Sequence, residues 1–349
     1  MSVLAIAFVP RERFSSWSLV TVSLLVFLAT VGLSTLASKD MGRSLRLSAF
    51  LLPATLLFLL VAEHFDGIRH VRVVCIAFST VALGAAAVVL WAWHAGAPKV
   101  STLGIPVFVV PNDLTFLAVV APLSLVLLYR EPRSLFGILA AASIFLSACA
   151  ICVLRSRTAA LTIVLCLICT SLLVQHRRWL LRSLAGVVVL IFLALLTNAL
   201  LFPHSQITTK FVHKKWTLNG REEYWSTAWK MFHEAPLLGN GPHTFGLFHP
   251  TPWAHNLYLE VLAEQGIVGF AALGFLLVTG TTAAWRVVGQ TGGEVRLFAA
   301  GTLAGLIGFC FAGGAELTLL REWVVTTLFT FLGIVEHLVS LQMKKGRIG

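Results

Sequence analysis

Three small groups of polar residues stand out in a chain that is otherwise strongly apolar. Arg155 and Arg157 flank a serine between two apolar runs, Arg221 follows an Asn-Gly turn, and His255-Asn256 precedes another apolar run. Two guanidinium groups can bind a diphosphate, because their donors pair bidentately with phosphate oxygens and stay charged at low dielectric. A nearby imidazole can accept a proton from a hydroxyl group at physiological pH. The three groups therefore suit transfer of a sugar from a lipid-linked diphosphate to a hydroxyl group, if the fold brings them together.

The composition places these residues in a membrane protein. The chain has 349 residues, of which 58% are hydrophobic and 12% charged, whereas soluble domains carry about 25% charged residues. Apolar runs of about 17–25 residues, long enough to cross a bilayer, recur along most of the sequence. We therefore expect an all-α, polytopic integral membrane protein. The net charge of +11 comes mainly from Lys and Arg in loops, so it indicates membrane topology and contact with membrane lipids rather than with nucleic acid.

Ten candidate spans can be assigned, with boundaries uncertain by about 2–4 residues. Arg155 and Arg157 separate the fifth span from the sixth, because a charge at the bilayer centre costs at least about 2.5–3.5 kcal/mol. The predicted spans are 17–37, 46–62, 72–94, 113–129, 134–154, 158–174, 183–201, 255–281, 297–314 and 322–341.

The distribution of Lys and Arg predicts the orientation of these spans. The short loops on one side hold more of these residues than those on the other, and the richer side includes both chain ends. We therefore expect both termini in the cytoplasm. The long loop, 202–254, would then face the exterior, which is the periplasm in a Gram-negative cell. We expect residues 1–349 to form a single integral membrane domain that includes this loop, because the loop is too small for a core of its own.

The long loop has a predicted order of its own. Residues Arg221 to Glu234 place Tyr224, Ala228 and Phe232 at the spacing of an amphipathic helix. Several Gly and Pro residues between 236 and 252 then interrupt regular structure. We expect a short helix on the outer membrane surface, followed by an irregular segment that leads into the eighth span.

Three stretches of this chain resemble successive motifs of the O-antigen ligase and polymerase superfamily. They are SRTAALTIVL from Ser156, GREEYWSTAWKMFHEAPLLGNGPHTFG from Gly220, and HNLYLEVLAEQGIVGF from His255. The resemblance covers about residues 150–275. The first half of the chain matches only in being a series of apolar helices.

The resemblance implies an integral-membrane glycosyltransferase of the GT-C type, with about twelve spans against the ten assigned here. Such enzymes work at the periplasmic face of the bacterial inner membrane and take glycan from undecaprenyl diphosphate. In the ligases the acceptor is a sugar hydroxyl of the lipid A core. No cofactor, metal or nucleotide sugar is expected. Arg157 and Arg221 match the arginines of the first two motifs, and His255 matches the histidine proposed to activate the acceptor. The sequence departs from the pattern at His243, where many members have a third glycine.

Four further residues are candidates for contact with substrate. Arg155 belongs to the first arginine pair, and Lys215 lies in the long loop, where it either attracts anionic lipid or saccharide or is an ordinary solvated charge. Asn256 suits the N-terminus of a helix, where its amide orients neighbouring groups. Glu264 matches the third motif. It shares a helix face with Glu260 and Asn256, and it serves either as a partner for His255 or an arginine, or as the lining of a water-filled vestibule.

The remaining polar residues give no indication of a further functional site. The six cysteines lie in apolar runs without polar neighbours, which favours packing over metal binding. The spacing of His243, His249 and His255 does not place them on one helical face, which disfavours a metal site. Glu316, Arg321 and Glu322 lie at one predicted turn, where we expect an ion pair that stabilises it.

Alternatives within the superfamily differ only in the acceptor. A polymerase would add glycan to another polyprenyl-linked glycan, and a protein O-oligosaccharyltransferase would add it to a protein. An alternative from another class is a transporter of lipid or polysaccharide without chemistry of its own. A transporter is expected to place charges near the bilayer midplane, often with repeat symmetry, whereas the charges here gather at one predicted face.

Overall fold

The computed structural model describes residues 18–94, 114–154, 156–174, 186, 221–319 and 321–346. Within these residues the regular structure is entirely α-helical. The helices are α1 (Leu19–Leu36), α2 (Met41–Glu63), α3 (Ile68–His94), α4 (Thr115–Arg130), α5 (Leu135–Val153), α6 (Arg157–Leu173), α9 (Arg221–Glu234), α10 (Phe245–Phe248), α11 (Leu257–Gln290), α12 (Gly293–Gly313) and α13 (Glu322–Gly346).

The helices agree with the predicted membrane architecture. Seven of the described helices are long and apolar enough to cross a bilayer, namely α1, α2, α3, α5, α11, α12 and α13, and α4 and α6 are shorter apolar helices. Each of these nine occupies a predicted span. The predicted span 183–201 lies outside the described residues, apart from residue 186. The all-helical, multi-pass class is thereby confirmed, while the total number of spans and the GT-C type stay predictions.

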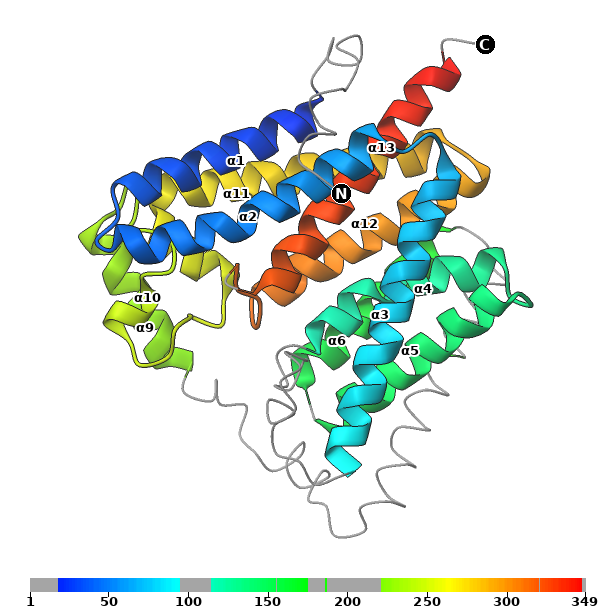
Figure 1. Ribbon diagram of the computed structural model, residues 1–349, viewed down its shortest axis with the longest axis horizontal. Helices are drawn as coiled ribbons and strands as arrows, with labels where there is room; N and C mark the ends of the chain where they lie inside the picture. Colours follow the sequence, from blue (N-terminus) through cyan, green and yellow to red (C-terminus); the bar gives the residue numbers. More distant parts are fainter. Residues whose placement is uncertain are drawn as a thin grey trace.

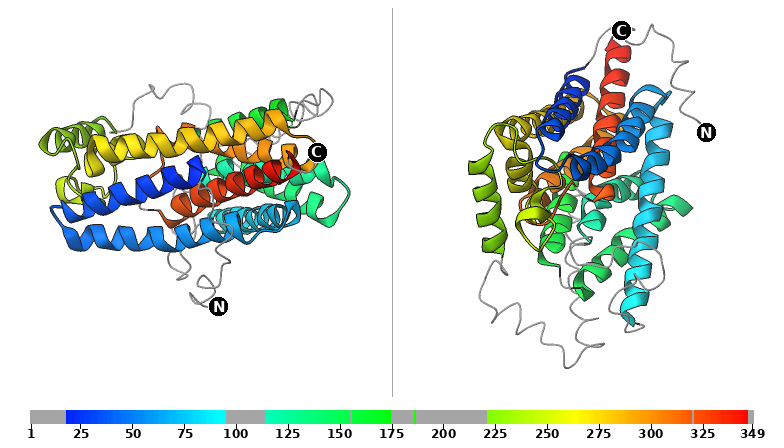
Figure 2. Two further views of the ribbon diagram at one scale, coloured as in Figure 1. Left: turned by 90° about the horizontal axis from the view of Figure 1, so that it is seen from above. Right: turned by 60° about the vertical axis from the view of Figure 1, so that its left-hand side comes forward.

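Successive helices run in alternating directions, so their connections gather at two opposite ends (Figure 1). At one end, Lys39 after α1 pairs with Glu234 of α9 at 2.7 Å. We call this the site end; it comprises the connection 37–40, residues 154, 156 and 221–256, and the turn between α12 and α13, of which residues 314–319 and 321 are described. At the other end, Arg72 pairs with Glu131 at 2.6 Å, and Arg130 with Glu294 at 2.7 Å. The left view of Figure 2 shows the long helices running side by side between these ends.

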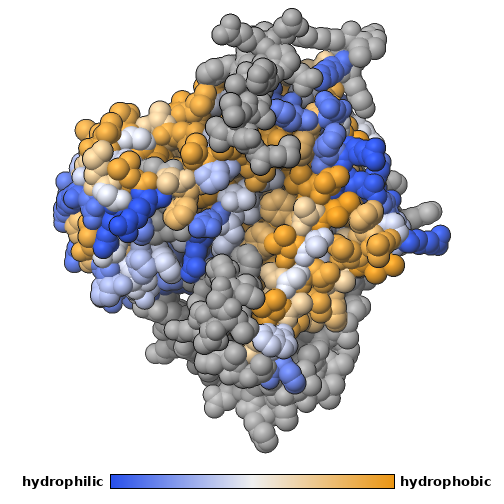
Figure 3. Space-filling model, in the orientation of Figure 1, coloured by the Kyte–Doolittle hydropathy of each residue, from blue (hydrophilic) through white to orange (hydrophobic). Residues whose placement is uncertain are grey.

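The surface between the two ends is apolar. In the face shown in Figure 3, hydrophilic residues gather at the lower left, over the site end, and at the upper right, and hydrophobic residues cover much of the coloured area between them. Large apolar side chains on several helices are exposed, including Leu52 at 63%, Val73 at 56% and Ile138 at 59%. A continuous exposed apolar surface of this kind indicates contact with a membrane.

Helices α4 and α12 form the centre of the bundle. Every residue of α4 from Thr115 to Leu127 is buried, and α12 packs against α4, α6, α11 and α13. Glycines on α12 allow these close contacts, as small residues do in membrane helices generally. A Cβ atom added at Gly301 would lie 2.5 Å from Val126 Cγ2, and one at Gly308 would lie 2.2 Å from Cys166 Sγ.

The eighth predicted span differs from the prediction in one respect. Helix α11 is interrupted at Gly266, where φ is 65° and ψ is −167°, a combination that only glycine adopts readily. The segment before this break, Leu257 to Gln265, is a short helix at the site end. The 24 residues after the break are sufficient to span a bilayer, at about 1.5 Å per residue. The polar residues at the front of the predicted span therefore precede the membrane-crossing helix.

Replacing Gly301 with alanine tests the close packing of α4 against α12. We expect a loss of about 1–3 kcal/mol in unfolding free energy, because the new methyl group would overlap Val126. Thermal unfolding in detergent, followed by tryptophan fluorescence, should show a lower midpoint. Gly274→Ala on α11 is the matched control, since its added Cβ would meet nothing within 4 Å. Equal midpoints for the two variants would contradict this packing.

Candidate functional site

Three helix beginnings and one turn meet at the site end. Helices α6, α9 and α11 all begin there, and the turn 314–321 connects α12 to α13 beside them (Figure 1). The side-chain amide of Asn256 donates to the carbonyl oxygen of Gly314 at 3.0 Å, which ties the start of α11 to this turn. The predicted site residues that the structure describes lie on or directly before the three helices.

Glu316 connects two of the helix beginnings. Its Oε1 atom accepts from Arg221 Nη2 at 2.5 Å and from Thr158 Oγ1 at 3.2 Å. The side chain is only 7% exposed, and Oε2 has no hydrogen-bond partner among the described residues. Burial raises the pKa of the Glu316 carboxyl above its usual range, and the adjacent Arg221 guanidinium opposes this shift. Glu316 therefore holds Arg221 against the start of α6.

Arg157 is the first residue of α6 and directly precedes Thr158. The helix is capped by Ser156, whose hydroxyl accepts from Ala159 N. Because Thr158 contacts the same carboxylate oxygen as Arg221, the beginnings of α6 and α9 lie close together. Arg157 itself is half-buried and makes no hydrogen bond or ion pair with the described residues. In this part of the chain no carboxylate competes for its guanidinium.

His255 lies directly before α11 in an uncommon backbone conformation, with φ of 52°. Its ring is 5.6 Å from the ring of Tyr224, which lies one turn after Arg221 on α9. Burial, together with the charges of Arg221 and Arg321, lowers the pKa of His255 to about 4. The imidazole is consequently neutral at physiological pH, which is the form that can accept a proton.

The indole of Trp253 links His255 to Arg321. Trp253 Nε1 donates to His255 Nε2 at 3.1 Å, so this ring nitrogen carries a lone pair rather than a proton. On the other side, the Arg321 guanidinium lies 4.8 Å from the centre of the Trp253 ring, in a cation–π contact. A hydroxyl group that gives its proton to Nε2 must therefore replace the indole N–H.

Asn256 has the helix-capping role that its type and position indicate. Its Oδ1 accepts from Tyr258 N at 3.0 Å and from Leu259 N at 3.1 Å, so it is the N-cap of α11. Its amide nitrogen is used by the bond to Gly314. The residue therefore fixes the direction in which α11 leaves His255. Direct contact of Asn256 with a substrate stays a prediction.

The two carboxylates of α11 hold the irregular segments in place. Glu260 accepts from Ala254 N at 3.2 Å and from the hydroxyl of Thr318, so it joins the residue before His255 to the turn 314–321. Glu264 accepts from His243 N at 2.8 Å and from Phe245 N at 2.9 Å. Both side chains are 2% exposed. Their bonds in this structure are structural, and substrate contact by Glu264 stays a prediction.

The break in α11 is filled by the segment 236–241. Ile267 N donates to Pro236 O at 2.9 Å, and Gly241 N donates to Glu264 O at 2.8 Å. The fit requires glycine, since a Cβ atom at Gly239 would lie 2.2 Å from the carbonyl carbon of Glu264. Residues 236–241 of the second motif and residues 264–266 of the third motif are thus two sides of one contact.

Some predicted residues lie away from this cluster or outside the described residues. Arg155 and Lys215 belong to the latter group. His243, which has a φ of 65°, lies on the side of the α1–α2 connection, where burial and the charges of Arg43 and Arg46 lower its pKa. His249 lies nearer the cluster, with its ring 4.8 Å from the ring of Tyr224 and its Nε2 atom 3.6 Å from Glu223 Oε1 on α9.

The structure also adds residues that the motifs do not indicate. At the turn where an ion pair was expected, Glu316 pairs with Arg221 of α9 instead of with a residue of the turn, and Arg321 lies over Trp253. The available signal was a cluster of charges at a junction between two apolar runs, close to the predicted outer face. The sequence does not reveal that this turn reaches α9, because the two are 95 residues apart.

One comparison with known families bears on this cluster. The family model described as O-antigen ligase matches residues 142–274, which extend from α5 into α11. A search of curated proteins found no match. The family match confirms the resemblance that the three motifs predict, over residues 142–274, which include Arg157, Arg221 and His255.

Proposed function

We propose that this protein is an O-antigen ligase of the bacterial inner membrane. It would transfer glycan from undecaprenyl diphosphate to a sugar hydroxyl of a lipid A core at the periplasmic face. The observation that carries the proposal is the cluster of Arg221, Glu316 and His255 at one end of a multi-pass helical bundle. The family match supports ligase or polymerase activity in general. The donor and acceptor are part of the proposal.

In the proposed reaction the arginines bind the diphosphate of the donor. Arg221 and Arg157 lie at adjacent helix beginnings, and a diphosphate between them would gain bidentate contacts. As the bond between the sugar and the diphosphate breaks, negative charge builds on the leaving oxygen, and the two guanidinium groups stabilise it. Glu316 must yield its bond to Arg221 when the diphosphate binds, because both compete for the same guanidinium.

His255 acts as the base in the same step. The acceptor hydroxyl replaces the Trp253 N–H at Nε2, gives its proton to the imidazole and forms the new bond to the anomeric carbon. The diphosphate leaves on the undecaprenyl tail with the electron pair of the broken bond. A single displacement of this kind inverts the anomeric configuration. No metal ion is required, because the arginines supply the positive charge.

The bilayer contributes to this proposal by confining both substrates. Two lipid-borne substrates in one leaflet meet far more often than free molecules would. The short helix before Gly266 and the segment 236–256 lie at the site end, outside the membrane-crossing part of α11. The distribution of Lys and Arg assigns this end to the periplasm and both termini to the cytoplasm.

The alternative functions within the superfamily differ in the acceptor molecule that they use. A polymerase or a protein O-oligosaccharyltransferase would use the same arginines and the same histidine. A transporter would have no need of an imidazole beside guanidinium groups at one end of the bundle, so the grouping of His255 with Arg221 favours an enzyme.

Reconstitution tests the proposal directly. Purified protein in liposomes receives undecaprenyl-diphosphate glycan and rough lipopolysaccharide, with a chelator present. We expect glycan on the lipid A core, and a loss of about 10²–10⁴-fold in His255→Ala, because a general base contributes that much. His233→Ala, an exposed histidine on α9, is the matched control and should retain activity.

Each other outcome has a distinct meaning. Elongated polyprenyl glycan as the product would show that the protein is a polymerase rather than a ligase. Unchanged transfer in His255→Ala would show that His255 is not the base. Absence of any transfer, with the donor intact, would contradict the proposed enzyme.

The pH dependence of the reaction should reflect the low pKa of His255. Activity requires the neutral imidazole, so kcat/KM for the donor should fall as pH drops through about 4 rather than through the ordinary value near 6.5. Arg321→Gln removes a nearby positive charge and should move this acid limb to higher pH. Arg286→Gln, on α11 near the opposite end, should leave the limb in place. An identical limb in all three proteins would show that Arg321 does not act on the base.

Glu316→Gln tests the competition for Arg221. The amide removes the charge that pairs with the guanidinium, so we expect a KM for the donor that is lower by about fivefold, corresponding to about 1 kcal/mol. Glu234→Gln is the matched control, because it removes an ion pair with Lys39 at the same end. A donor KM that rises in Glu316→Gln would instead show that the carboxylate only positions Arg221.

A further inference from the structure

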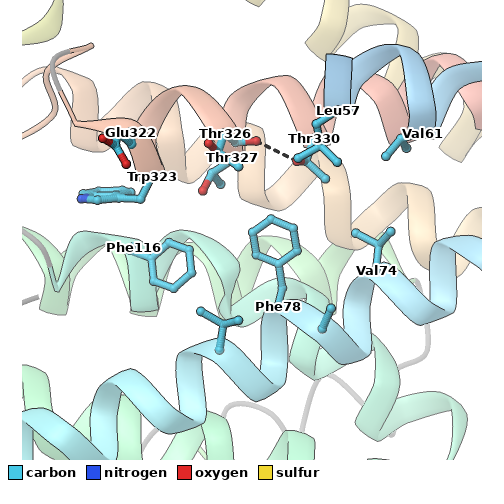
Figure 4. Close-up of a pocket in the computed structure, with 12 residues that line it drawn as sticks. Leu57, Val61, Val74, Phe78, Phe116, Glu322, Trp323, Thr326, Thr327 and Thr330 are labelled. Carbon is cyan, nitrogen blue, oxygen red and sulfur yellow. Dashed lines mark hydrogen bonds between the residues drawn. The ribbon is translucent and has the colours of Figure 1, made fainter. Parts of the chain in front are cut away.

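A groove of about 510 Å³ lies between α2, α3, α4 and α13 (Figure 4). Its walls are mostly aliphatic and aromatic, and Val81 on its rim is 53% exposed, so the groove opens to the apolar exterior of the bundle. The lining residues are Leu57, Val61, Val74, Ala77, Phe78, Val81, Phe116, Glu322, Trp323, Thr326, Thr327 and Thr330.

One polar atom in this groove lacks a partner. Thr327 is 1% exposed, and its hydroxyl makes no hydrogen bond with the described residues. A threonine in a helix commonly donates to the carbonyl four residues earlier, and Thr330 does so to Thr326 O at 2.7 Å. The side chain of Thr327 points from α13 toward the space above Phe116 and Phe78 (Figure 4). A buried hydroxyl without a partner is unfavourable, and a bound acceptor atom would supply the missing hydrogen bond.

The polar end of the groove lies beside the candidate site. Glu322 and Trp323 at this end directly follow Arg321, whose guanidinium contacts Trp253, the residue that donates to His255. Thr327 lies five residues further along α13, about 7.5 Å deeper at 1.5 Å per residue. Beyond it the lining is mostly hydrocarbon, with Val61 and Val74 on opposite walls, and the hydroxyl of Thr330 is already bonded to Thr326 O. A ligand in the groove would thus place a polar head near His255 and a chain between the helices.

We propose that this groove binds one fatty-acyl chain of the lipid acceptor, with the ester or amide carbonyl of that chain accepting from Thr327 Oγ1. The inference rests on the proposed function and identifies the acceptor as an acylated lipid. The tail of a polyprenyl donor is hydrocarbon throughout and offers no acceptor atom to Thr327. The volume falls in the range of about 300–1,000 Å³ that holds one small ligand, which suits a single chain.

Photocrosslinking tests the occupant without relying on activity. The protein in liposomes is exposed to a lipid A-type glycolipid with a diazirine on an acyl chain, or to a polyprenyl diphosphate with a diazirine in its tail. We expect the acyl probe to label the groove lining on α3 and α13 and the polyprenyl probe to label it at least tenfold less. Ala77→Phe fills the groove and should abolish the acyl labelling.

Kinetics with two acceptors then test the role of Thr327. Thr327→Val keeps the shape and removes the hydroxyl, so KM for the acylated acceptor should rise about fivefold or more. KM for a deacylated core oligosaccharide and for the donor should not change. Thr330→Val is the matched control, because its hydroxyl is already bonded within the helix.

The outcomes distinguish failure of the acyl-groove proposal from failure of the proposed function. Stronger labelling by the polyprenyl probe, or no labelling by either probe, would overturn the acyl site. Equal KM changes in Thr327→Val and Thr330→Val would overturn the role of the hydroxyl. Acyl labelling without transfer to any acceptor would overturn the proposed function and leave the groove as a lipid site.

Discussion

The site end of this protein depends on how the backbone is satisfied where α11 breaks. A helix that is interrupted next to a bilayer leaves amide and carbonyl groups without partners, and lipid cannot provide them. Here the segment 236–241 provides them, with bonds to Ile267, Val268 and the carbonyl of Glu264. The same contact requires glycine at two facing positions, Gly239 and Gly266. This contact fixes the irregular segment that leads from α9 to His255.

Buried carboxylates extend this arrangement to the other elements. Glu264 accepts from the backbone at the start of α10, Glu260 joins Ala254 to Thr318, and Glu316 joins the start of α9 to the start of α6. Each buried charge is costly unless it is hydrogen-bonded. The acids therefore have few alternative arrangements, and together they hold guanidinium groups and an imidazole close to one another. In the absence of an anion, Glu316 balances the charge of Arg221.

The groove along α13 and the cluster around His255 share one turn. Residues 314–321 provide Glu316 to Arg221 and Arg321 to Trp253, and α13 continues directly into the groove. Binding of a lipid chain beside α13 would therefore affect His255, because Arg321 and Trp253 lie between the groove and the imidazole. Such a connection would allow the protein to select an acceptor by its anchor as well as by its sugar.

The sequence by itself determined the elements and much of the local structure. Apolar runs defined the spans, the spacing of aromatic and apolar residues predicted α9 with both its ends, and the family motifs pointed to Arg157, Arg221 and His255. These features depend on residues that are near in the chain, so a single sequence contains them. The partner of Glu316, the indole on His255, the segment that fills the break at Gly266 and the unpaired hydroxyl of Thr327 were decided only by the tertiary structure. The indole bond joins residues that are only two apart, and it forms where His255 has the uncommon φ of 52°. The other three features involve elements that are distant in the chain, and helix packing, rather than local propensity, sets which of their side chains meet.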